Sequence, residues 1–184
     1  LRQLINLLAG IPSVIFGLFG MTTIVPFLRD YVSPNGVGYG ILAASLVLAV
    51  MILPTVVSVS LDSLSAVPKS YYEGALALGA TKEEAVFGIV LPAAKNGITA
   101  GIVLATGRAL GETMAVMLVI GGSPEIPGSL FQSVRTLTAN IAMGAMELKD
   151  DALSALIASG VVLFVFALLL NISFSALRCG KKKE

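Results

Sequence analysis

The sequence lacks histidine and tryptophan, and it contains a single cysteine, Cys179, among 184 residues. The absence of histidine excludes the commonest general base and the commonest metal ligand in proteins. One cysteine cannot form an internal disulfide bond. No phosphate-binding Gly-rich loop with its lysine and no nucleophile–base pattern is present. We therefore expect no enzyme active site, no metal and no cofactor.

Charged residues are also scarce. They make up 12% of the chain, and the net charge is +1. Soluble domains contain about 25% charged residues, so the composition is unusual, and the balanced charge gives no basic surface for nucleic acid. Hydrophobic residues reach 56%, the mean hydropathy is +0.92, and they gather in runs of the roughly 20 residues that cross a bilayer. The sequence therefore predicts an all-α polytopic membrane protein.

Four apolar segments are long enough to be spans of a single transmembrane domain, and they cover residues 7–28, 37–61, 97–120 and 152–177. Because cytoplasmic segments are enriched in lysine and arginine, the basic residues predict the orientation. Most of them fall at the termini or between the second and third spans: Arg2, Lys69, Lys82, Lys95, Arg178, Lys181, Lys182 and Lys183. The opposite side has only Arg29, Arg135 and Lys149. We expect both termini and residues 65–96 in the cytoplasm, and residues 121–151 outside.

The cytoplasmic segment is predicted to form two short helices. Pro68 suits the first turn of a helix, and Gly79 suits a left-handed C-terminal cap. Thr81 and Glu84 have the spacing of a capping box that begins a second helix, which should end before Pro92.

The two short helices carry apolar side chains that no bilayer would bury. These side chains either dock into a groove on a partner protein or pack against the chain's own helix ends, and their spacing favours neither interpretation. They are Tyr71, Tyr72, Leu76 and Leu78.

The same segment resembles the coupling loop of ABC importer permeases. The signature of that loop is Glu-Ala-Ala, three residues, Gly, nine residues and Ile-x-Leu-Pro. Residues 73–75 (Glu-Gly-Ala), Gly79 and residues 89–92 (Ile-Val-Leu-Pro) match it at every spacing, with glycine in place of the first alanine. The resemblance implies docking into a cleft of a separate ATPase subunit. The residues that it assigns to coupling are Tyr72, Glu73, Ala75, Gly79, Leu91 and Pro92.

The third span carries two charged residues, Arg108 and Glu112. Such a residue inside a membrane costs about 2.5–3.5 kcal/mol on insertion scales. Their four-residue spacing puts both on one face of a continuous helix, where they can pair. The pair is either a structural ion pair that fixes the helix register or part of a pathway in which Arg108 meets an anion. The second interpretation is favoured, because intramembrane charges are rarely idle and guanidinium binds phosphate with two donors at once.

Small residues recur at every fourth position of this span, a pattern typical of closely packed membrane helices. One series is Gly97, Gly101, Ala105 and Ala109, and the other is Gly107, Gly111 and Ala115. We therefore expect this helix to lie among other helices, with its charges facing away from lipid.

Residues 107–116, Gly-Arg-Ala-Leu-Gly-Glu-Thr-Met-Ala-Val, closely resemble a segment of the PstC-type phosphate permeases of type I ABC importers. Residues 11–20 and 135–142 resemble other parts of the same family, so the resemblance covers essentially the whole chain. It implies a MetI-like helical bundle. The family has six spans and this chain begins with Leu1, so we expect about two spans upstream. The residues assigned to the substrate pathway are Arg108, Glu112, Thr113, Thr138 and Asn140.

The external segment allows two interpretations. Residues 131–146 suit an amphipathic segment at the membrane face. Its polar residues Thr136, Thr138 and Asn140 face the pathway or an external binding protein, or the segment is only a lid that closes the bundle.

The resemblance also implies an assembly in the bacterial inner membrane. Its members would be a second, PstA-like permease, a PstB-like ATPase pair, an external PstS-like phosphate-binding protein, and phosphate itself. An importer permease for another oxyanion or small solute is the nearest alternative. A membrane enzyme lacks the required residues, and a scaffold has no need of charges inside a packed span.

Overall fold

The computed structural model describes residues 5, 7–8, 10–146 and 150–180. In this part of the chain the regular structure is helical, apart from one isolated bridge between Gly121 and Val134. Four of the described helices are long and apolar enough to cross a membrane: Ser13–Val32, Ile41–Ser65, Lys82–Leu110 and Leu153–Phe174. The expected class, an all-α polytopic membrane protein, is confirmed. Of the basic residues used to predict the orientation, those at 2, 149 and 181–183 lie outside the described residues.

The first span is one helix assembled from α2 (Ser13–Phe19), η1 (Gly20–Ile24), α3 (Val25–Phe27) and η2 (Leu28–Val32). Its two η segments are wider π turns. The first of them precedes Pro26, which has no N–H to donate to the preceding turn. A widened turn lets the helix pass such a residue without ending.

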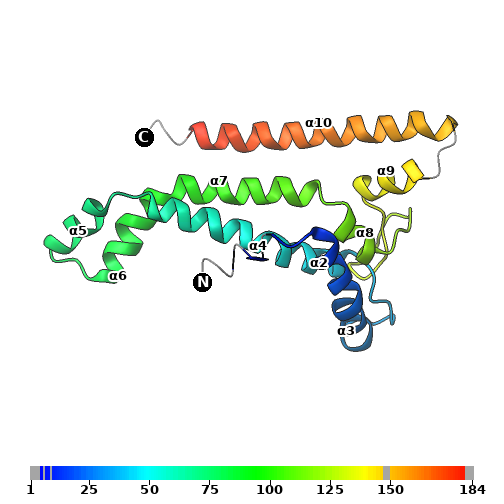
Figure 1. Ribbon diagram of the computed structural model, residues 1–184, viewed down its shortest axis with the longest axis horizontal. Helices are drawn as coiled ribbons and strands as arrows, with labels where there is room; N and C mark the ends of the chain where they lie inside the picture. The colour runs from blue at the N-terminus through cyan, green and yellow to red at the C-terminus, as the bar shows by residue number, and fades with distance from the viewer. Residues whose placement is uncertain (1–4, 6, 9, 147–149, 181–184) are drawn as a thin grey trace.

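The second and third spans pack side by side in opposite directions, as α4 (Ile41–Ser65) and α7 (Leu91–Leu110) (Figure 1). The glycines of the first small-residue series lie at this contact. A Cβ added to Gly101 would lie 2.9 Å from the Cβ of Val59, and one added to Gly97 would meet Ser63. The absence of side chains at these glycines therefore lets the two helices approach closely, as the sequence predicted.

The main core lies where α8 (Met114–Ile120) meets the first span and α4. A Cβ on Gly17 would lie 2.7 Å from the Cα of Ala115, and one on Gly20 would meet Val47 and Val119. The buried apolar residues of this core are Val25, Leu28, Ala43, Ala44, Val47, Met51, Ala115, Val116, Val119 and Ile120. Although α8 is short, its contacts with this core hold it firmly in place.

The remaining helices define two ends of the molecule. Figure 1 shows α5 (Lys69–Ala77) and α6 (Lys82–Ala85) at one end of the long axis, and α3, α8 and α9 (Leu137–Met146) at the other. The last helix, α10 (Asp150–Gly180), begins beside α9 and runs back past α7.

The third span differs from expectation at both ends. The helix that we expected to end before Pro92 instead continues from α6 through the π turn η3 (Val86–Val90) into α7. Pro92 lies in the first turn of α7, and the π turn precedes it. At the other end the helix stops at Leu110, and not at residue 120, because the chain leaves helical geometry before α8 begins.

The contact between α4 and α7 yields a first prediction. Gly101→Val should lower the midpoint of thermal unfolding of the full-length permease by several degrees, because overpacking costs about 1–3 kcal/mol. Gly107→Val is the matched control, since no atom lies within 4 Å of a Cβ at Gly107. Unfolding in detergent measures both, and equal midpoints for the two variants would contradict the packing.

Candidate functional site

The central feature of the site is a break in the third span between α7 and α8. Gly111 ends α7 with φ −85° and ψ −4°, and Thr113 precedes α8 with φ −114° and ψ −58°. The N–H of Glu112 still donates to the Ala109 carbonyl at 3.3 Å. Two helices therefore meet at residues 111–113, where backbone groups that a continuous helix would satisfy need other partners.

Arg108 lies in the last turn of α7, and its side chain is exposed. Within the residues that the structure describes, no ion pair joins it to Glu112. The pairing that we expected at four-residue spacing is wrong, because the helix ends at Leu110 and Glu112 lies beyond it. The neighbouring Gly107 also borders open space. Arg108 therefore presents its positive charge on an open face of the chain.

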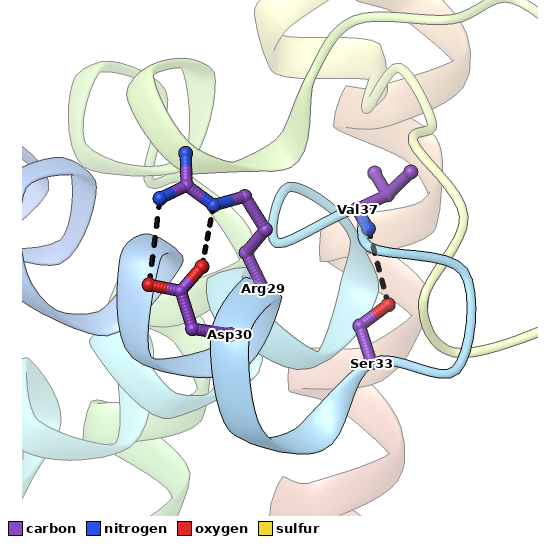
Figure 2. Close-up of polar contacts among 4 residues, drawn as sticks. All are labelled: Arg29, Asp30, Ser33 and Val37. Atoms are coloured by element: carbon purple, nitrogen blue, oxygen red, sulfur yellow. Dashed lines mark hydrogen bonds and ion pairs between the residues drawn. The ribbon is translucent and has the colours of Figure 1, made fainter.

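Arg29 provides a contrast within the same chain. Its Nε donates to Asp30 Oδ1 at 2.8 Å, and its Nη2 donates to Oδ2 at 3.4 Å (Figure 2). Both side chains are about half exposed. To the right of this pair in Figure 2, Ser33 Oγ accepts the N–H of Val37 and closes the turn after η2. Arg29 thus has an adjacent carboxylate to balance its charge, whereas Arg108 forms no ion pair with any carboxylate in the described part of the chain.

The side chain of Glu112 bonds to the helix that follows it, α8. Its carboxylate Oε1 accepts the N–H of Ala115 at 3.2 Å and so caps the first turn of α8. Carboxylates at such positions satisfy free N–H groups and interact favourably with the positive end of the helix dipole. The side chain is half-buried. Glu112 therefore stabilises the break itself and does not act as a counter-ion for Arg108.

Thr138 connects α9 to the same break. Its hydroxyl donates to the carbonyl oxygen of Glu112 at 3.1 Å and lies 3.1 Å from the hydroxyl of Thr136. The Thr138 residue is 8% exposed. Thr136 in turn accepts the N–H of Ala139 at 3.2 Å, which caps α9. A continuous polar chain thus runs from α8 through the break into α9.

Asn140 is tied to a different neighbour. Arg135 donates from Nη1 to Asn140 Oδ1 at 3.4 Å and from Nε to the Gly122 carbonyl at 3.0 Å. Thr113 makes a local contact, with its hydroxyl donating to the Gly111 carbonyl at 3.3 Å. Among the five expected pathway residues, the structure thus brings Glu112 and Thr138 into direct contact.

A cavity of about 400 Å³ lies beside the break. Ser45, Glu112, Thr136 and Thr138 supply its polar lining, while α10 contributes Leu163 and Phe166. Arg108 is exposed and is not part of this lining. Thr136 was expected only as one of the polar residues of the external segment and not as one of the five pathway residues, although a threonine just before an apolar helical stretch is a typical N-cap signal.

The expected helix pair is present at the opposite end of the molecule. Gly79 has φ +89°, the left-handed conformation that glycine adopts at little cost. The capping box is confirmed: Thr81 Oγ1 accepts the Glu84 N–H at 3.3 Å, and Glu84 Oε2 accepts the Thr81 N–H at 2.8 Å. Local sequence signals therefore fix this turn.

The apolar side chains of the helix pair divide into two groups. Leu78 is 91% exposed and Tyr71 is 53% exposed, so neither packs fully against its own chain. Tyr72 and Leu76 are half-buried. Of the expected coupling residues, Glu73, Gly79, Leu91 and Pro92 are exposed, and Ala75 is buried. The pair thus presents an apolar surface around Leu78.

The fold and these two features define a class: a polytopic helical membrane protein in which one helix links an exposed helix pair to a broken, charged segment. The family follows from sequence comparison. Residues 1–179 match the family described as binding-protein-dependent transport system inner membrane component, and the chain belongs to this family.

Several characterised relatives are similar over most of this chain. A probable ABC transporter permease protein, YqgH, of Bacillus subtilis is 41% identical over 92% of the chain and 55% of its own length. The phosphate transport system permease proteins PstC of Mesorhizobium japonicum and Xylella fastidiosa are 40% and 38% identical, over 90% and 97% of the chain. The chain spans 57% and 61% of those two relatives. No solved structure matches it.

The capping box can be tested directly. Thr81→Ala removes the hydroxyl that caps α6 and should cost about 1 kcal/mol, so amides at 82–85 should exchange with solvent roughly fivefold faster. Hydrogen–deuterium exchange with mass spectrometry measures this in the full-length permease. Lys82→Ala changes an exposed neighbour without removing the cap and serves as the control. Equal exchange in the two variants would contradict a stabilising cap.

Proposed function

We propose that this chain belongs to the transmembrane permease subunit of an ATP-driven importer of inorganic phosphate. The observation that carries the proposal is Arg108, an exposed guanidinium without a carboxylate partner in the described chain, at the end of a membrane-spanning helix. A planar guanidinium can donate to two phosphate oxygens at once. The PstC relatives are phosphate transport system permease proteins by name, and this supports the choice of anion.

The proposed pathway contains the five residues Arg108, Glu112, Thr113, Thr138 and Asn140. In this proposal Arg108 supplies the positive potential that a partly dehydrated anion requires. Glu112 and Thr138 lie at the adjacent break. Thr113 directly follows Glu112 in sequence, and Asn140 lies on α9, the helix that carries Thr138. A passage site must also release its ion. A single positive charge on an open face suits brief binding better than an enclosed cage.

The orientation of the chain in the membrane is also part of this proposal. With the helix pair in the cytoplasm, Lys69, Lys82 and Lys95 lie on the cytoplasmic side, as basic residues usually do. The break at residues 111–113 and helix α9 then belong to the outer half, at the opposite end of the long axis (Figure 1). The subunit would lie in the bacterial inner membrane with residues 121–151 outside.

We infer that ATP hydrolysis belongs to a separate, PstB-like ATPase pair that the helix pair contacts. Leu78, Tyr71 and Glu73 are exposed there, and an apolar patch on a compact helix pair suits a groove on a partner. A second, PstA-like permease would complete the pathway, and a PstS-like phosphate-binding protein would deliver phosphate from outside. The continuous helix Lys82–Leu110 would carry movement between the two ends.

The role of Arg108 can be tested by uptake of radiolabelled phosphate. Cells lacking the gene would carry the full-length permease, either wild type, Arg108→Gln or Arg29→Gln, with equal membrane levels verified. Arg108→Gln should lower uptake about tenfold or more, since a lost hydrogen bond to a charged group costs about 1.5–3 kcal/mol. Arg29→Gln should retain uptake, because Asp30 already balances that charge.

Two results would contradict these assignments separately. Normal uptake by Arg108→Gln would mean that Arg108 has only a structural role. The assignment of phosphate as the substrate would then still stand. Failure of the wild type to restore phosphate uptake, with the protein present in the membrane, would contradict phosphate as the substrate and favour another oxyanion or small solute.

The coupling surface predicts a separate effect on assembly. Leu78→Asp should weaken co-purification of the ATPase subunit roughly fivefold or more, because a charge would replace an apolar contact at the proposed interface. Ile126→Asp is the matched control: Ile126 is 96% exposed but lies in the segment proposed to be external. Equal ATPase recovery with both variants would contradict docking at this helix pair.

A further inference from the structure

We propose that Thr138 is a positioning residue of the phosphate pathway: through the carbonyl of Glu112, it fixes where the last turn of α7 presents Arg108. This inference rests on the proposed function. It assigns to Thr138 a specific task, performed through its backbone contact and not by contact with the passing anion.

The first observation is the uneven support of the two helices at the break. Helix α8 is anchored in the core, with Ala115, Val116 and Val119 almost fully buried. By contrast the last turn of α7 has no fully buried residue: Gly107 and Arg108 are exposed, and Ala109 and Leu110 are half-buried. The end of α7 therefore needs a contact from elsewhere to stay in place, since helix ends without such partners fray.

The second observation is that Thr138 supplies such a contact. Its hydroxyl donates to the Glu112 carbonyl at 3.1 Å from a different helix, at a sequence separation of 26 residues. Glu112 follows Arg108 by one turn, and its N–H still donates to Ala109 in α7. A hydrogen bond at the Glu112 carbonyl thus restrains the 112–113 peptide, which directly follows the peptide whose N–H closes the Arg108 turn.

The third observation is that the hydroxyl of Thr138 is already engaged in hydrogen bonds within the protein. It is buried, and it is engaged by both the Glu112 carbonyl and the Thr136 hydroxyl. Thr136 caps α9 through the Ala139 N–H, so the position of Thr138 is itself fixed. Through the hydrogen bonds of this polar chain, the position of α9 determines the position of the end of α7.

The same geometry explains how Arg108 stays available for an anion. The Glu112 carboxylate is held by the Ala115 N–H at the start of α8. Loosening of the break would let this carboxylate swing back toward Arg108, which is only four residues away. The Thr138 hydrogen bond therefore keeps the negative charge of Glu112 on α8 and the positive charge of Arg108 free.

The test uses the complete transporter, with the full-length permease, reconstituted in proteoliposomes. The readout is the amount of phosphate moved per ATP hydrolysed, which a simple loss of folded complex would not change. Thr138→Val should lower this ratio roughly threefold or more, because small misplacements of a binding group are costly. Thr138→Ser keeps the hydroxyl and should restore the ratio. Thr138→Ala, which removes the hydroxyl without filling its space, is the second variant if Thr138→Val fails to assemble.

Two controls make the result specific. Thr106→Val removes a hydroxyl from α7 that bonds only to the Ile102 carbonyl of its own helix, and it should leave the ratio at the wild-type value. The double variant Arg108→Gln with Thr138→Val should be no worse than Arg108→Gln alone, because residues that act through one another are not additive.

Four outcomes would overturn the proposal. A wild-type ratio in both Thr138→Val and Thr138→Ala, or losses that multiply in the double variant, would show that Thr138 does not act through Arg108. Failure of Thr138→Ser to rescue would exclude the hydroxyl as the cause. A wild-type complex that hydrolyses ATP but moves no phosphate would instead overturn the proposed function, and this inference with it.

Discussion

The structure depends on how the chain satisfies its backbone where the third span is broken. Within a bilayer no water is available to bond with free N–H and C=O groups, so irregular backbone there needs partners from the protein. At residues 111–113 these partners are the Glu112 carboxylate, which caps α8, and the Thr138 hydroxyl, which meets the Glu112 carbonyl. The break allows α8 to enter the core while α7 ends on an open face. Without it Arg108 and Glu112 would pair along one helix.

Close helix packing makes the rest of the third span a rigid connector. Glycines at its contact with α4 allow the two backbones to approach, and the helix continues from Lys82 to Leu110. At 1.5 Å per residue such a helix is about 40 Å long, comparable to a whole bilayer with its headgroups. The helix pair at one end and the charged break at the other are therefore joined by a single element. For a transporter oriented as proposed, this arrangement would give a direct route by which movement at the helix pair reaches the proposed pathway.

Local features of the structure were predictable from the sequence, and contacts between distant residues were not. The turn at Gly79 and the capping box of Thr81 and Glu84 depend on residues within one helical turn, and both are confirmed. The apolar runs gave the class and the four spans. The continuity of the helix through Pro92 was not predictable. Proline has no N–H to donate to the preceding turn, and the π turn that ends two residues earlier lets the helix continue past it. The pairing of Arg108 with Glu112 was wrong because it assumed a continuous helix. The contact of Thr138 with Glu112 joins separate helices, and no spacing rule reveals it.

The most direct test of the central claim, that Arg108 lies on a water-accessible anion pathway, is chemical accessibility. Arg108→Cys would be placed in a Cys179→Ser full-length permease and treated with a membrane-impermeant thiol reagent. The open position of Arg108 predicts rapid labelling that inorganic phosphate slows, whereas Ala105→Cys, at a buried position against α4, should remain unlabelled. Labelling of Arg108→Cys only by lipid-soluble reagents, with no effect of phosphate, would put Arg108 against lipid or a partner helix and contradict the claim.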